Sequence, residues 1–184
     1  MFRVNDCINF EDKEYVISKF LGQGGMGHVF LIKDKTGSSK FALKTLQHYL
    51  PDDNNHRSLI NEWEKAQKIS HKNTIRYHGF HDGLSKPSTP YLIMELAHDG
   101  SLEDFLKNQS SLLEEDACLG IFHQIIDGME AVNEVLVHRD IKPDNIFTLW
   151  RQDRTPQEIL LDQITLSVPG GHGINILRRT SLPL

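Results

Sequence analysis

Glu62 is a charged residue whose sequence neighbours predict burial. Glu62 falls on a stripe that recurs every three or four residues through a predicted helix over residues 55–70. The other members of the stripe are Leu59, Trp63, Ala66 and Ile69. A carboxylate on a buried face is costly unless a cation pairs with it. Lys44 precedes Glu62 by 18 residues and shares one face of a predicted strand with Ala42, although a lysine taken alone at this position would be predicted to be exposed.

A glycine-rich segment, GQGGMG, occupies residues 22–27 and is followed by Val29. Glycines at these spacings can serve a hairpin turn alone, and a dinucleotide-binding fingerprint would need a helix after them. Residues that favour strands flank the segment instead, over 15–21 and 28–33. The segment is therefore predicted to join two strands.

The most specific motif is the run HRDIKPDN at residues 138–145. A capped turn after a helix would explain Asp144 or Asn145 individually but not all eight residues. The run resembles the catalytic loop of Ser/Thr protein kinases residue for residue. The glycine-rich loop between strands, the FALK strand at 41–44 and the nine-residue step from Glu62 to HKNTI at 71–75 resemble the same family.

The resemblance implies an ATP- and Mg²⁺-dependent kinase that phosphorylates Ser or Thr in a protein substrate. Asp140 would accept the proton of the substrate hydroxyl, and Lys142 would neutralise the γ-phosphate. Lys44 would hold the α- and β-phosphates, and Glu62 would hold Lys44. Asn145 would bind one Mg²⁺ ion.

The resemblance also implies a nucleotide site between two lobes. The segment LIMELA at residues 92–97 looks like the hinge, with Met94 as gatekeeper and the backbone of Glu95 and Ala97 facing the adenine edge. Ser101 would lie near the ribose. The complete set of expected nucleotide-binding residues is Leu21, Gly22, Gly24, Gly27, Val29, Ala42, Lys44, Met94, Glu95, Ala97, Ser101 and Phe147.

The predicted fold is α+β, with a bilobal arrangement like that of a protein kinase. Five strands and one inserted helix form an N-lobe over residues 15–94, and residues 95–100 form the hinge. Residues 101–147 form an incomplete helical C-lobe, in which Ser101 and Asp104 predict a capped helix start. A long helix is predicted over residues 114–135. Its expected core face is Cys118, Ile121, Phe122, Ile125, Met129 and Val132.

Composition narrows the function classes. The net charge of −5 predicts neither nucleic-acid binding nor a polybasic membrane anchor, and no apolar run is long enough to span a bilayer. Cys7 and Cys118 are expected to be buried free thiols of a cytoplasmic protein. Residues 1–14 read as an N-terminal extension, and residues 148–184 as a divergent tail.

The tail departs from the family pattern. A kinase needs an Asp-Phe-Gly segment about 13 residues after the catalytic-loop Asn, but Glu158 occupies that position. Asp162 lies 17 residues after Asn145, and it is either the missing metal ligand or a turn residue. Only 44 residues follow Asp140, so the peptide-docking helices are not expected. Their lack would expose the apolar face of the helix over 114–135 and favour self-association.

Two interpretations of the tail stay open. Read one frame over, the codons of residues 158–160 can encode Asp-Phe, and those of residues 170–181 can encode an activation-segment end, which suggests a frameshifted or truncated kinase gene. The rival is a minimal kinase. For the function, the alternatives are a nucleotide-binding pseudokinase and a small-molecule phosphotransferase, and Lys142 argues against the latter.

Overall fold

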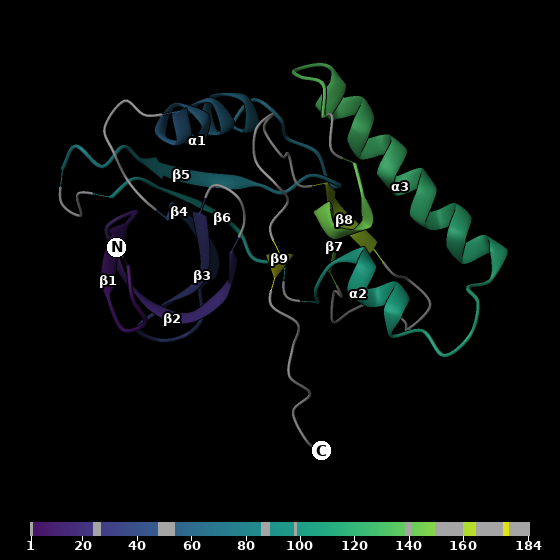
Figure 1. The fold of residues 1–184 in the computed structure, drawn as a ribbon, viewed down its shortest axis with the longest axis horizontal. Coiled ribbons are helices and arrows are strands. Elements are labelled where there is room, and N and C mark those ends of the chain that lie inside the picture. Colours follow the sequence, from purple (N-terminus) through teal and green to yellow (C-terminus); the bar gives the residue numbers. More distant parts are fainter. Residues whose placement is uncertain are drawn as a thin grey trace.

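The computed structural model describes residues 2–23, 27–47, 54–85, 89–97, 99–138, 141–149, 160–164 and 175–176. A curled antiparallel sheet with one helix across it forms one half of the molecule, and helices with a small second sheet form the other (Figure 1). This arrangement confirms the predicted α+β fold with an N-lobe and a partial helical C-lobe. Among the described residues, none of the helices has the length and apolar character that a bilayer span requires.

The large sheet has the strand order β1-β2-β3-β4-β6-β5, and every neighbouring pair on this path is antiparallel. Strand β9 pairs with β2 off this path. The strands are β1 (Cys7–Phe10), β2 (Lys13–Gln23), β3 (Gly27–Asp34), β4 (Lys40–Leu46), β5 (Tyr77–His81), β6 (Tyr91–Glu95) and β9 (Asn175–Ile176). The five strands expected from the sequence correspond to β2 through β6.

Helix α1 (Asn54–Ala66) lies across this sheet (Figure 1). Its buried residues are His56, Leu59, Glu62 and Ala66, which confirms the helical spacing read from the sequence. Leu59 packs with Leu46 of β4 and Leu92 of β6, so one apolar cluster fixes the helix to two central strands. The position of Glu62 over the sheet follows from this packing.

The other half contains α2 (Leu102–Lys107), α3 (Glu115–Asn133), the short 3-10 helix η1 (Pro143–Asn145), β7 (Ile146–Leu149) and β8 (Leu160–Ile164). Strands β7 and β8 form an antiparallel pair. Ser101 caps α2 in a reciprocal capping box with Asp104, as the sequence predicted. Leu102, Ile121 and Ile146 tie α2, α3 and β7 together. Ala66, Ile69 and Val132 connect the end of α1 to α3.

One face of α3 differs from the sequence expectation. Its buried residues are Ile121, Gly128 and Val132, whereas Phe122 is 61% exposed and was wrongly predicted to lie in the core. Apolar residues occur on more than one side of this helix, and Phe122 is one residue, or about 100° of helical rotation, away from the buried Ile121. Helical periodicity therefore could not say which apolar side packs against the rest of the chain.

The residues before Tyr15 are built into the sheet. Strand β1 pairs with β2, and the amide of Asn5 donates to the carbonyl of Ile17 at 2.8 Å. Phe2 and Ile8 are buried in a core cluster with Tyr15, Ile17, Phe30, Ile32, Leu43, Tyr91 and Ile93. Cys7 is exposed and Cys118 is half-buried, which corrects the predicted burial of both thiols. Alternate strand residues face opposite sides, so burial of Ile8 turns Cys7 outward.

Truncation of Ile8 tests whether this first strand contributes to the core. Ile8 is 2% exposed, so Ile8→Ala should lower the free energy of unfolding by about 2–4 kcal/mol. Val4 is 45% exposed, and Val4→Ala should change it by less than about 0.5 kcal/mol. Urea unfolding of both variants measures the difference. Equal stability of the two would show that residues 2–10 do not fold onto the sheet.

Candidate active site

Lys44 and Glu62 form a buried ion pair between β4 and α1. The Lys44 Nζ atom lies 2.8 Å from Oε1 and 2.6 Å from Oε2 of Glu62. The residues are 7% and 1% exposed. Lys44 sits at the centre of the sheet, where it pairs with Val29 of β3 and Leu92 of β6. Burial removes both charges from water, so the pair contributes more to position than to stability.

Tyr77 is a third member of this group, and the sequence analysis missed it. Its hydroxyl donates to Glu62 Oε1 at 2.8 Å. The pKa of Tyr77 is raised well above the usual 10 by burial first, and then by the charge of Glu62 and the hydrogen bond to it. The hydroxyl therefore stays protonated and acts as a donor. A strand over residues 74–80 was predicted from the sequence, but nothing there indicated the contact with Glu62.

An apolar cluster beside the ion pair gathers the expected adenine-binding residues. Val29 of β3, Ala42 of β4, Met94 of β6 and Phe147 of β7 are buried together. Ala42 and Met94 are direct partners in the sheet. The remaining members of the cluster, or residues packed against it, are Leu21, Ile75, Tyr77, Leu96 and Ala97. Since Phe147 comes from the small second sheet, the two halves of the molecule meet at this cluster.

Two glycines of the glycine-rich loop lie within the described residues. Gly22 of β2 pairs with Val29. A Cβ atom at Gly27 would overlap the backbone carbonyl oxygen of Thr45 in β4, so only glycine permits this close approach of the first residue of β3. Gly27 thus has a structural requirement separate from any ligand. Gly24 lies outside the described residues.

The expected hinge has backbone and side-chain groups that are already engaged. The amide of Glu95 donates to the carbonyl of Arg76 at 2.8 Å. Ser101 donates to Asp104 Oδ2 at 2.9 Å, and its Oγ atom accepts from the Asp104 amide at 3.1 Å. A ribose at Ser101 would have to share this capping group.

Of the catalytic-loop motif, the structure describes residue 138 and residues 141–145. Asp140, the predicted proton acceptor, lies outside the described residues. His138 is 1% exposed and Asn145 is 2% exposed, while Lys142 is half-buried. The amide of Asn145 donates to the carbonyl of Lys142 at 2.9 Å, and Pro143 begins η1, where its fixed backbone angle suits a helical start. Asn145 lies two residues before Phe147, which belongs to the apolar cluster.

The strand register separates the two predicted metal ligands. Ile164 of β8 pairs with Ile146 of β7, which directly follows Asn145. Asp162 lies inside β8, three residues along the ladder from the position opposite Asn145, or about 10 Å at the rise of a strand. The side chain of Asp162 is outside the described part, so its role as a ligand stays a prediction. No group of three or more His, Cys, Asp or Glu side chains suited to a metal occurs among the described residues.

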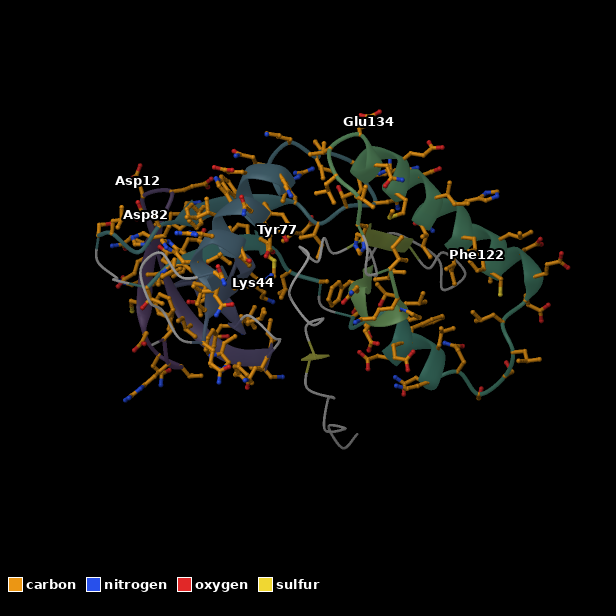
Figure 2. The ribbon with its side chains drawn as sticks, turned by 45° about the horizontal axis from the view of Figure 1, so that its top comes forward. Asp12, Lys44, Tyr77, Asp82, Phe122 and Glu134 are labelled. Carbon is orange, nitrogen blue, oxygen red and sulfur yellow. The ribbon has the colours of Figure 1, made fainter. Side chains whose placement is uncertain are left out.

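Lys44 and Tyr77 lie together in the half that contains the large sheet, whereas Phe122 lies on α3 in the other half (Figure 2). The site is therefore built from the sheet, α1 and the first strand of the small sheet. It combines a buried, paired ammonium group at Lys44, the apolar cluster and a buried side-chain amide at Asn145.

The chain is similar in sequence to known proteins. A family model described as the protein kinase domain matches residues 15–157. An Aurora kinase of Yarrowia lipolytica is 33% identical over 140 residues, which cover 75% of this chain and 37% of that protein. An Aurora kinase of Schizosaccharomyces pombe is 36% identical over 135 residues, covering 72% of this chain and 37% of that protein.

A bacterial relative gives the same result. The serine/threonine-protein kinase PksC of Streptomyces coelicolor is 32% identical over 143 residues, covering 74% of this chain and 26% of that protein. The chain thus spans roughly a third of the length of the curated relatives it matches. The matched residues include every element that builds the ion pair and the apolar cluster, and the chain therefore belongs to the protein kinase domain family.

Proposed function

We propose that the chain binds ATP with Mg²⁺ and transfers the γ-phosphoryl group to a Ser or Thr hydroxyl of a protein. The observation that carries the proposal is the buried Lys44–Glu62 pair beside the apolar cluster of Val29, Ala42, Met94 and Phe147. The names of relatives such as PksC support Ser/Thr as the acceptor. The proposed location is the cytoplasm, where ATP is available and cysteine thiols stay reduced.

Binding would use the two parts of the site separately. Val29, Ala42 and Phe147 would enclose the adenine ring, and the carbonyl of Glu95 would accept from its amine. An ammonium group has three donors, and Lys44 directs two of them at the Glu62 oxygens. The third donor would then point at the α- and β-phosphates, with its direction set by the carboxylate.

Transfer would be an in-line displacement at the γ-phosphorus. The substrate hydroxyl forms the new O–P bond while the bond to the β,γ-bridging oxygen breaks, and ADP leaves. Asp140 would take the hydroxyl proton, and Lys142 would face the charge on the transferring group. Bound Mg²⁺ supplies charge neutralisation on the phosphates. Asn145 is the proposed ligand for it, with Asp162 as a second candidate.

A second function is favoured by one observation. The register of β7 and β8 leaves Asp162 three residues from the position opposite Asn145. If no other carboxylate completes the metal site, the chain would bind ATP through Lys44 and the apolar cluster but transfer little phosphate. Such a protein would be a nucleotide-binding regulatory module rather than an enzyme, and its affinity for ATP would depend weakly on Mg²⁺.

The exposed apolar side of α3 supports a further partner, a second copy of this chain. Leu119, Phe122 and Ile126 are 47%, 61% and 53% exposed. Their spacing of three and four residues places them in one stripe on the helix. We propose that two copies cover this stripe on each other.

Phosphoryl transfer is tested with purified protein, labelled ATP, Mg²⁺ and a mixed protein substrate. The unmodified chain should incorporate label, and Asp140→Asn should lower the rate by at least about 100-fold because the proton acceptor is lost. Asp140→Asn should still bind ATP, because the substitution leaves Lys44, Glu62 and the apolar cluster proposed to hold the nucleotide unchanged.

The outcomes separate the two functions. ATP binding without transfer by the unmodified chain would support the regulatory module and overturn the enzyme. Absence of ATP binding by a folded sample would overturn both. ATP affinity is also measured with and without Mg²⁺. For the enzyme, Mg²⁺ should strengthen ATP binding; for the regulatory module, it should change the affinity little.

Self-association through α3 is tested by sedimentation. Phe122→Glu places a charge in the apolar stripe and should convert dimers to monomers at micromolar concentration. Asn61 is exposed on α1, away from the stripe, and Asn61→Glu serves as the control with an unchanged dimer. A monomeric unmodified chain, or equal loss of the dimer in both variants, would contradict the proposed interface.

A further inference from the structure

Tyr77 occupies a place where the sheet changes its register. Tyr77 of β5 pairs with Met94 of β6, but the next pair joins Gly79 to Ile93, so one extra residue bulges between them. A bulge bends the strand and re-aims its side chains. Here it allows the first residue of β5 to direct its ring toward α1, while Gly79 and Phe80 continue the ladder.

The ring of Tyr77 contacts three apolar clusters at once. One contains Val29, Ala42, Met94 and Phe147, the expected adenine slot. Another contains Ala66 and Val132, which join α1 to α3. The third contains Leu46, Leu59 and Leu92, which fix α1 to the sheet. The methyl group of Ala66 leaves room for an aromatic ring at this junction.

The hydroxyl of Tyr77 completes the coordination of the Glu62 carboxylate. Oε1 of Glu62 accepts from Tyr77 at 2.8 Å and from Lys44 at 2.8 Å, while Oε2 accepts from Lys44 at 2.6 Å. Donors from two strands, β5 and β4, therefore hold one carboxylate. With Lys44 alone, the carboxylate could rotate and carry the ammonium group with it. The second donor, Tyr77, opposes that rotation because turning the carboxylate would break its bond to Oε1.

We propose that Tyr77 is a positioning residue for the phosphate-binding Lys44, which it aligns by holding the Glu62 carboxylate. The inference rests on the proposed ATP-binding function and deepens it. Tyr77 does not touch the phosphates, because its hydroxyl is used by Glu62. It sets the direction in which Lys44 presents its remaining donor, and its ring makes that direction depend on the packing of α1 against the sheet.

The discriminating experiment compares ATP with adenosine on Tyr77→Phe. This substitution keeps the ring in its three clusters and removes only the hydroxyl. Loss of a hydrogen bond to a charged group should weaken binding of Mg-ATP by about tenfold. Adenosine lacks phosphates, so its affinity should not change. If Tyr77 served packing alone, the substitution would weaken the binding of both ATP and adenosine, or of neither.

Tyr91→Phe is the matched control. Tyr91 is a buried tyrosine of the same sheet, with its ring against Phe2 and His81 rather than against Glu62. The Tyr91→Phe variant should bind ATP and adenosine with the same affinities as the unmodified chain. In the background of Glu62→Gln, Tyr77→Phe should have little further effect on ATP affinity, since the two residues act as a unit.

A readout independent of any ligand comes from tyrosine ionisation, followed by NMR of the ring Cζ carbon. The pKa of Tyr77 is raised by burial and then by Glu62, so Glu62→Gln should lower it. The pKa of Tyr91 is raised by burial alone and should not respond. An unchanged Tyr77 pKa in Glu62→Gln would overturn the contact and therefore the inference.

The results also distinguish this inference from the proposed function. Failure of the unmodified chain to bind ATP would overturn the proposed function and the inference with it. Normal ATP binding with equal affinities in Tyr77→Phe and the unmodified chain would overturn the inference alone. Weaker binding of both ATP and adenosine by Tyr77→Phe would do the same, because it would assign Tyr77 to packing.

Discussion

A charge removed from water must find a partner, and this constraint governs the arrangement around Lys44 and Glu62. Each of the two residues is less than a tenth exposed. Lys44 is fixed by the central strand β4, so α1 must lie where Glu62 can reach it. The packing of Leu59 against Leu46 and Leu92 holds α1 in this position. The hydrogen bond from Tyr77 holds the Glu62 carboxylate there.

The second half of the molecule is attached through contacts that follow from this placement. Ala66 and Ile69, at and after the end of α1, pack on Val132 of α3. Ile146 of β7 packs on Leu102 and Ile121, and the next residue, Phe147, joins Val29 and Ala42 in the apolar cluster. The ion pair and the apolar cluster are adjacent because strand β4 contributes Lys44 to one and Ala42 to the other.

Sequence patterns predicted the parts of this arrangement that depend on local spacing. Glu62 was found because a carboxylate interrupted a helical stripe, and the Ser101–Asp104 cap because its residues are three apart. Tyr77 was missed because a β-bulge, which leaves no periodic mark, directs its ring. Phe122 was misplaced because α3 is apolar on two sides, and only packing decides between them. The distance between Asn145 and Asp162 depends on strand register, which residue spacing does not specify.

The central claim is that the apolar cluster of Val29, Ala42, Met94 and Phe147 and the Lys44–Glu62 pair together bind ATP. Methyl NMR during titration with Mg²⁺ and a non-hydrolysable ATP analogue tests it most directly. The account predicts shifts at the methyl groups of Val29, Ala42 and Met94, which belong to the apolar cluster. It predicts none at Ile17 and Ile32, which belong to the other core cluster of the sheet. No shift at saturating nucleotide, or equal shifts in both clusters, would contradict it.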